Sequence, residues 1–186
     1  MNLLLGFAPF FTFAVASHLS GPVVGLVAGM VVSAILAARE ILRGKAPKIL
    51  ELGTLLLFGA LCAYTLAARP QWTLMEVRLI VDIGLLLIVV GSLLIGKPFT
   101  IQYAREQVPP AQWDTPQFAA INRRITGIWA MAFVVIVVAD LLLTFAPQVS
   151  PHFGIVLTIL ALVWAMKRTN RLSGGNGSAP AKTGAG

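Results

Sequence analysis

Long apolar runs, separated by short clusters of charged residues, constrain the fold of this sequence more than any other feature. The runs over residues 79–96 and 125–146 each hold a single charged residue. Their lengths are close to the roughly 20 residues that a helix needs to cross the hydrocarbon core of a bilayer. Of the 186 residues, 58% are hydrophobic and 11% are charged, whereas soluble domains have roughly 45–50% and about 25%. We therefore expect a membrane protein.

The same runs distinguish between the two architectures that span membranes. In lipid, each backbone amide must be satisfied within a helix or in a closed barrel. The run 79–96 lacks the alternation of polar and apolar residues that barrel strands have. The expected fold class is therefore all-α, a polytopic transmembrane helical bundle.

About six spans are predicted. They cover roughly residues 3–18, 22–38, 49–68, 79–96, 125–146 and 150–166. The first run is short and contains Pro9, and the last follows Pro147 and Pro151, so each of them either spans incompletely or tilts. Five full spans are the alternative.

Basic residues predict the orientation, because Lys and Arg accumulate in short cytoplasmic loops. Twelve of the 14 Lys and Arg residues fall on one side of the six predicted spans, and Arg69 and Arg78 fall on the other. The twelve are Arg39, Arg43, Lys45, Lys48, Lys97, Arg105, Arg123, Arg124, Lys167, Arg168, Arg171 and Lys182. We expect a multi-pass membrane protein with both termini cytoplasmic.

A cleavable signal peptide is the alternative for the first run, because Ala14-Val15-Ala16 resembles a cleavage motif. Against it, Met1-Asn2 supplies none of the basic residues with which such a peptide begins.

One long connection, residues 97–124, mixes apolar, charged and proline residues. We expect an amphipathic turn around Tyr103, and then a helix that starts near Asp114 and continues into the fifth span. Asp114 and Gln117 have the spacing of a capping box. This cytoplasmic loop is either an ordinary membrane-surface loop or a docking surface for a partner, with Tyr103 and Trp113 as candidate contacts.

Residues 1–172 then form the membrane domain, and the Gly/Ala/Ser-rich tail 173–186 is expected to be disordered.

Small residues recur at every fourth position of the second run: Gly21, Gly25, Gly29, Ser33 and Ala37. This pattern lets helix backbones approach closely in a membrane. It predicts helix packing, either within the chain or between two copies of it.

Asp82 and Asp140 are the ionisable residues deepest within apolar runs. A carboxyl group inside a membrane is costly, so each is a candidate functional residue. Asp82 is expected to pair with Arg78 one helical turn away. Asp140 has no local basic neighbour and should face the interior of the bundle, where it is protonated, paired or hydrated.

Signatures of other chemistry are weak. Cys62 is the only cysteine, so neither an intrachain disulfide nor a thiolate metal site can form. His18 and His152 fall on the same predicted side but lack a carboxylate at ligand spacing. We expect no metal and no cofactor.

Neither catalysis nor nucleic-acid binding is indicated. No Walker loop, dinucleotide fingerprint, GxSxG elbow or HExxH pair occurs, so the chain is not expected to be an enzyme. The net charge of +7 comes from basic residues at the ends of apolar runs, which is typical of membrane topology, so nucleic acid is not an expected partner.

Two further groups of residues are expected to lie at the membrane boundary. Glu51, beside Lys48, is interpreted as part of a solvated helix start. The four tryptophans are interpreted as interfacial anchors; they are Trp72, Trp113, Trp129 and Trp164.

Several segments resemble the bacterial intracellular septation protein A family. They are Phe7-Ala8-Pro9-Phe10-Phe11, Lys48-Ile49-Leu50-Glu51, Lys97-Pro98, Trp113, Asn122, and the stretch from Trp129 to Phe133. The resemblance covers most of residues 1–166 and implies a multispanning inner-membrane protein linked to division and envelope synthesis. It supplies no catalytic residues, and the alternative is a separate membrane family.

Two functions are carried forward. The leading hypothesis is a noncatalytic inner-membrane scaffold or accessory protein in cell-envelope maintenance or septation, whose partners are membrane lipids and other inner-membrane proteins or a second copy. The alternative is a small transporter, channel or lipid-handling protein that uses Asp140 and Asp82.

Overall fold

The computed structural model describes residues 3–146, 148 and 150–174. In this part of the chain the regular elements are α-helices and one short 3-10 helix, with no β-strand. Five helices are long and apolar enough to cross a membrane. They are α3 (Pro22–Leu42), α4 (Ile49–Ala68), α5 (Leu74–Leu94), α7 (Pro116–Phe145) and α8 (Pro151–Gly174). The all-α helical bundle expected from the sequence is confirmed, and the chain has the build of a multi-pass membrane protein.

The first apolar run is divided into α1 (Leu3–Gly6) and α2 (Ala8–Ser20). The break falls at Phe7, just before Pro9, which occupies the first turn of α2 where a proline is tolerated. With 13 residues, α2 is about 20 Å long at 1.5 Å per residue, which is shorter than the hydrocarbon core. Of the six predicted spans, five therefore have spanning length, and α2 packs beside α3 and α5.

Several helices extend beyond the predicted runs because polar residues cap or continue them. The helix α5 begins five residues earlier than expected. There the Thr73 hydroxyl accepts a hydrogen bond from the Glu76 amide, and the Thr73 amide donates to the Glu76 carboxylate at 2.9 Å. A polar cap of this kind lies outside the apolar run from which the span was predicted.

The helix expected to start near Asp114 and to continue into the fifth span is present as α7, but its predicted cap was wrong by one residue. The N-cap of α7 is Thr115, whose hydroxyl accepts from the Phe118 amide at 3.3 Å, so Asp114 and Gln117 do not form the capping box. The predicted boundary of the tail was also displaced, because α8 includes Ser173 and Gly174. The rest of the tail, residues 175–186, lies outside the described residues.

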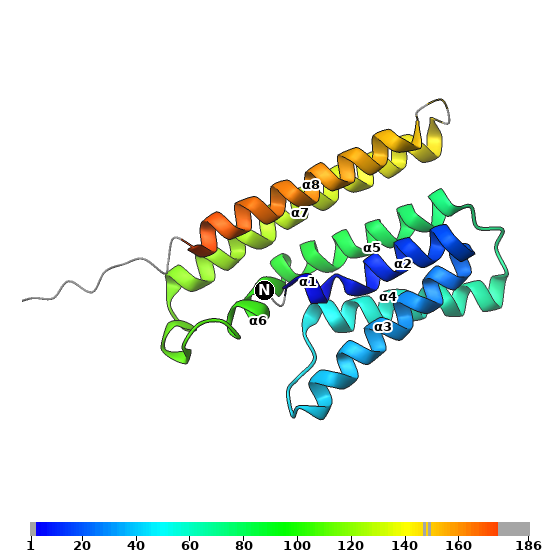
Figure 1. Ribbon diagram of the computed structural model, residues 1–186. Helices are drawn as coiled ribbons and strands as arrows, with labels where there is room; N and C mark the ends of the chain where they lie inside the picture. The colour runs from blue at the N-terminus through cyan, green and yellow to red at the C-terminus, as the bar shows by residue number, and fades with distance from the viewer. Residues whose placement is uncertain (1–2, 147, 149, 175–186) are drawn as a thin grey trace, which may run out of the picture.

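The helices run as antiparallel neighbours (Figure 1). The hairpin of α7 and α8 packs on α5 through α7, while α3 packs between α2 and α4. The two described chain ends, the connection 43–48 and the short helix α6 (Phe99–Ala104) gather at one end of the bundle, named here the α6 end. The opposite end holds the turn between α2 and α3, where Gly21 lies, and the connection 69–73 between α4 and α5, and is named the Gly21 end.

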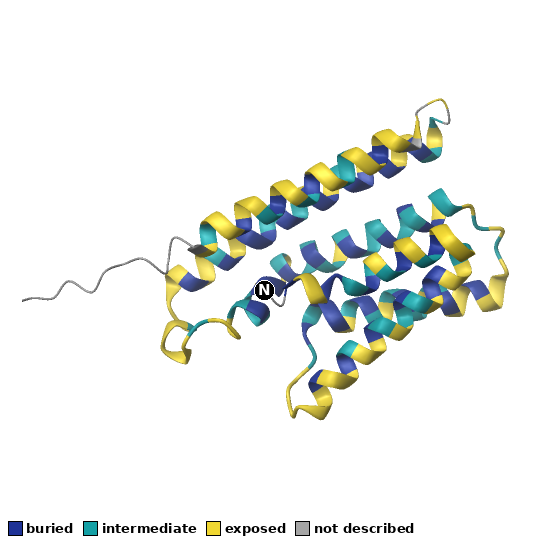
Figure 2. Cartoon of the chain, in the orientation of Figure 1, coloured by how far each residue is buried: buried dark blue, intermediate teal, exposed yellow. Residues whose placement is uncertain are grey.

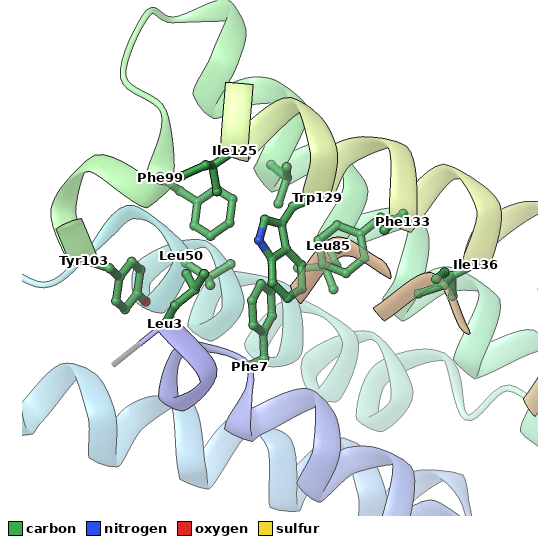
Figure 3. Packing of buried hydrophobic residues seen from close by; sticks show 14 residues of the cluster. Leu3, Phe7, Leu50, Leu85, Phe99, Tyr103, Ile125, Trp129, Phe133 and Ile136 are labelled. Atoms are coloured by element: carbon green, nitrogen blue, oxygen red, sulfur yellow. The ribbon is translucent and has the colours of Figure 1, made fainter. Parts of the chain in front are cut away.

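The larger apolar core lies where α1, α4, α5, α6 and α7 meet (Figure 3), and α8 adds Ala161 and Ala165 to it. At its centre Trp129 stacks on Phe7 with ring centroids 4.8 Å apart, and its indole N–H donates to the Thr169 hydroxyl at 3.1 Å. Trp129 is only 1% exposed. Its interpretation as an interfacial anchor was therefore wrong: it is a core residue that joins α7 to α8.

Outward-facing positions of the long helices are exposed and largely apolar (Figure 2). Leu56, Leu66 and Leu87 are examples, and each is at least 65% exposed. In water this surface would cost much free energy, whereas in a bilayer it meets lipid chains.

Candidate functional site

A groove runs between α2 and α8, with its floor formed by α5 and α7. Its volume is about 550 Å³, which lies within the roughly 300–1,000 Å³ of typical ligand pockets. Aromatic and aliphatic side chains make up most of the lining, and Trp129 and Phe133 belong to it. The helix α8 packs mainly on α7, so among the described helices α2 and α8 are not a major packing pair across the groove.

The polar lining residues gather toward the Gly21 end of the groove. They are Ser17, His18, Arg78, Asp82 and Thr158. Their common position follows from topology, because α2 ends and α5 and α8 begin at this end of the bundle. The groove is therefore amphipathic, with an apolar inner part and a charged outer part.

Arg78 connects three helices at the charged part of the groove. Its Nε lies 3.0 Å from Asp140 Oδ1 and 3.8 Å from Asp82 Oδ2, and its Nη2 donates to the Thr158 hydroxyl at 3.0 Å. The sequence led us to expect the contact with Asp82 on the same helix. The shorter contact is with Asp140 of α7, which periodicity within one run does not reveal.

Asp140 is 1% exposed and faces the bundle interior. Although Oδ1 is close to Arg78, neither carboxylate oxygen makes a hydrogen bond of good geometry with the described residues. Asp82, in contrast, lines the groove. Two ionised carboxylates and one guanidinium carry a net charge of −1, which is costly in apolar surroundings.

Both acids lie within the long helices. Because α5 begins at Leu74, Asp82 is eight positions along it, or about 12 Å at 1.5 Å per residue. Asp140 is five positions before the end of α7, about 8 Å from that end. The earlier start of α5 places Asp82 deeper than a start at Leu79 would.

A second charged cluster lies at the α6 end, around Lys48. Its Nζ lies 3.2 Å from a Glu40 oxygen, 3.5 Å from Glu51 and 3.1 Å from Glu106, and stands 5.1 Å from the centre of the Tyr103 ring. Burial alone would lower the pKa of Lys48, but the neighbouring carboxylates outweigh it and raise that pKa above its ordinary value.

The interpretation of Glu51 as part of a solvated helix start was wrong. Glu51 is 6% exposed and accepts a hydrogen bond from the Lys48 amide at 3.1 Å. Its position three residues after Lys48 was a usable signal for this cap. The participation of Glu40 and Glu106 could not be foreseen in this way, because Glu40 lies on α3 across the connection 43–48 and Glu106 comes from the distant segment after α6.

Tyr103 is not available to a docking partner, and its assignment as a docking residue was wrong. It is 3% exposed, and burial raises the pKa of its hydroxyl, as do the nearby carboxylates of Glu51 and Glu106. The amphipathic turn α6 packs inward: the Ile49 amide donates to the Gln102 side chain at 2.6 Å. Figure 3 shows the Tyr103 ring beside Leu3 and Leu50.

Trp113, the other docking candidate, lies on the surface loop and is partly exposed. Its indole N–H donates to the Val108 carbonyl at 3.1 Å, and the Arg105 guanidinium stands 5.3 Å from its ring centre. These local contacts fix the ring without burying it.

The predicted small-residue stripe contacts helices of the same chain. A methyl group added at Gly25 would overlap the Ser17 hydroxyl of α2, and one added at Gly29 would lie 2.8 Å from the Phe58 ring of α4. Ser33 is buried and its hydroxyl donates to the Gly29 carbonyl. Gly21 is not part of this face; it forms the turn before α3 with φ of 94°.

The two histidines have different surroundings. His18 lines the groove, whereas His152 is exposed with Nδ1 3.2 Å from the Ser150 hydroxyl. Over the described residues, no group of three or more His, Cys, Asp and Glu side chains is arranged to hold a metal ion.

Comparisons with protein-family models, with curated proteins and with solved structures find no match to this chain.

Proposed function

We propose that this chain binds a small amphipathic molecule in the α2–α8 groove, as a transporter or lipid-handling protein of the membrane. The observation that carries the proposal is the amphipathic lining of the groove. A molecule with an apolar tail and a polar head would bury the tail against Trp129 and Phe133 and place the head beside Arg78 and Asp82. This role is binding rather than catalysis.

The contacts of α8 support access from the bilayer. Because α8 packs mainly on α7, a ligand can enter between α2 and α8 without having to push two tightly packed helices apart. The charged groups at the polar end are held by contacts between α5, α7 and α8. Fixed polar groups beside an apolar cavity orient a ligand and give it specificity.

The proposal places the protein in the bacterial inner membrane, and the distribution of basic residues supports an orientation with both termini cytoplasmic. In this orientation the α6 end faces the cytoplasm, and the Arg78 cluster lies in the outer half of the membrane. The ligand head would then lie toward the periplasmic side.

Fluorescence quenching of Trp129 tests the proposal. In a protein with the other three tryptophans replaced by phenylalanine, Trp129 is shielded from bulk lipid by its burial. A bromine-labelled long-chain amphiphile should quench it saturably if the tail occupies the groove. A protein that retains only Trp164, which is 42% exposed on α8, reports the bulk bilayer. Quenching of Trp129 that never exceeds the level expected from bilayer partitioning would refute the proposal.

A scaffold or accessory role in envelope maintenance or septation is the second candidate, favoured by the partly exposed Trp113 on the surface loop. A photocrosslinker at position 113 should then capture one defined inner-membrane protein in cells. Position 87, exposed on the outer face of α5, is the matched control. Crosslinks to lipid alone at both positions would count against this role.

A further inference from the structure

We infer that Asp82 is an exchange site at which the ammonium head of a long-chain amine replaces a proton. This inference rests on the proposed function, because the tail of the amine would occupy the same groove. It adds the chemical class of the ligand and a coupling of ligand binding to proton release.

Charge balance in the cluster favours a cation. The Nε atom of Arg78 lies 3.0 Å from Asp140 Oδ1 and 3.8 Å from Asp82 Oδ2, which is 0.8 Å farther. The guanidinium therefore principally neutralises Asp140. The negative charge of an ionised Asp82 is then not balanced by Arg78. A lone carboxylate in a largely apolar groove is costly unless it takes up a proton or another cation.

The geometry distinguishes the two carboxyls. Asp140 is buried behind Arg78, whereas Asp82 lines the groove and is accessible to a ligand. Two elements besides α5 contribute titratable groups to this part of the bundle: α7 contributes Asp140, which contacts Arg78, and α2 contributes His18. The other polar side chains that line the groove, Ser17 of α2 and Thr158 of α8, are uncharged.

The exchange balances without a co-reactant. The protonated carboxyl of Asp82 gives its proton to water at the Gly21 end, and the carboxylate that forms pairs with the ammonium group of the ligand. The net charge of the groove is the same before and after exchange. Ligand binding therefore releases one proton, and a fall in pH drives the amine out.

The test uses the protein that retains only Trp129, in vesicles, with three bromine-labelled probes of equal chain length. The probes are a primary amine, an alcohol and a carboxylic acid. We expect the amine to quench at the lowest concentration, with release of about one proton per amine bound. Its apparent affinity should fall as the pH is lowered, because protons compete for the same carboxylate, while that of the alcohol should not change.

Variants locate the exchange at Asp82. Asp82→Asn should weaken amine binding at least about tenfold and abolish proton release, since an ion pair of low exposure is lost. Asp82→Glu retains the charge and should retain both properties. His18→Gln should still release the proton, which separates Asp82 from the other titratable group of the groove.

The outcomes separate this inference from the proposed function. Equal saturable quenching by amine and alcohol without proton release would overturn the exchange site and leave the groove as a binding site. Tighter binding of the acid than of the amine would also overturn it. No saturable quenching by any probe would remove both proposals.

Discussion

Arg78 and Lys48 each contact more than one carboxylate, in clusters at opposite ends of the bundle. Lys48 faces three glutamates, and Arg43 adds a second positive charge at 3.8 Å from Glu40. Removing one partner of a buried ion pair leaves the others uncompensated, which usually costs more than the pair itself contributes. The two basic residues are therefore sensitive positions for stability.

Lys48→Met should destabilise the protein by about 3 kcal/mol or more, because Glu51 would remain buried without its cation and Glu40 would keep only the more exposed Arg43 at 3.8 Å. Thermal unfolding in detergent measures the change. Lys45→Met, an exposed position in the same connection, is the matched control and should have little effect. Equal stability of both variants would show that the cluster contributes little.

The pH dependence of stability follows from the same cluster. The folded-state pKa of Lys48 is raised above its ordinary value of 10.5, so its charged form is stabilised by folding. This contribution is fully present below the ordinary pKa and is lost as the pH rises through the raised one. Stability should therefore decline above about pH 10.5 in the native protein, and Lys48→Met should remove that part of the decline.

A charge-balance cycle tests the contact between Arg78 and Asp140. Arg78→Gln should destabilise the protein by about 3 kcal/mol or more, because the buried Asp140 loses the cation that lies 3.0 Å from it. Asp140→Asn in the same chain should recover part of this loss, since one of the two carboxylates is removed. Additive losses in the double variant would mean that the 3.0 Å contact has no energetic role.

At the scale of the helices, the sequence predicted most of the fold because membrane spans are encoded locally. Apolar length identified α3, α4, α5, α7 and α8, with shifts of several residues at their ends. Pro9 was the local sequence signal for the break between α1 and α2. Contacts between helices were less predictable: Trp129 was expected at an interface and lies in the core. No local pattern specifies which distant side chains surround a residue.

The candidate site was predicted in part for the same reason. Asp82 and Asp140 were identified individually, because any charged residue within an apolar run is conspicuous. Their common partner Arg78 was foreseen only for Asp82, which is one turn away on the same helix. The groove itself depends on the placement of α8 relative to α2, which no periodicity encodes.

Gly25→Leu should separate α2 from α3, because any side chain at this position overlaps Ser17 and lies 2.9 Å from the Phe13 carbonyl oxygen. We expect a loss of about 2 kcal/mol or more from overpacking. Gly59→Ala on α4 is the control: no atom lies within 4 Å of the added methyl group, so stability should be unchanged or slightly higher. Unfolding in detergent compares the two.

For the whole molecule, the division of the first apolar run raises the question of where the N-terminus lies. An odd number of crossings would place the chain ends on opposite sides of the membrane, whereas both described ends lie at the α6 end. A methyl group at Gly6 would overlap the Tyr103 hydroxyl, so the start of the chain packs against α6. We therefore expect the segment formed by α1 and α2 to act as a sixth, interrupted crossing, in addition to the five helices of spanning length.

Cysteine labelling tests this arrangement in cells. Gln71→Cys lies in the exposed connection at the Gly21 end, and Lys45→Cys and Ala111→Cys lie in exposed segments toward the α6 end. The native Cys62 is buried and should react little. A membrane-impermeant maleimide should label position 71 in intact spheroplasts, and positions 45 and 111 only after permeabilisation. Positions 45 and 111 are separated by two crossings, α4 and α5, so they should lie on the same side of the membrane. If they were labelled from opposite sides, the number of crossings between them would be odd, and α6 could not pack against the start of α4 as the structure shows.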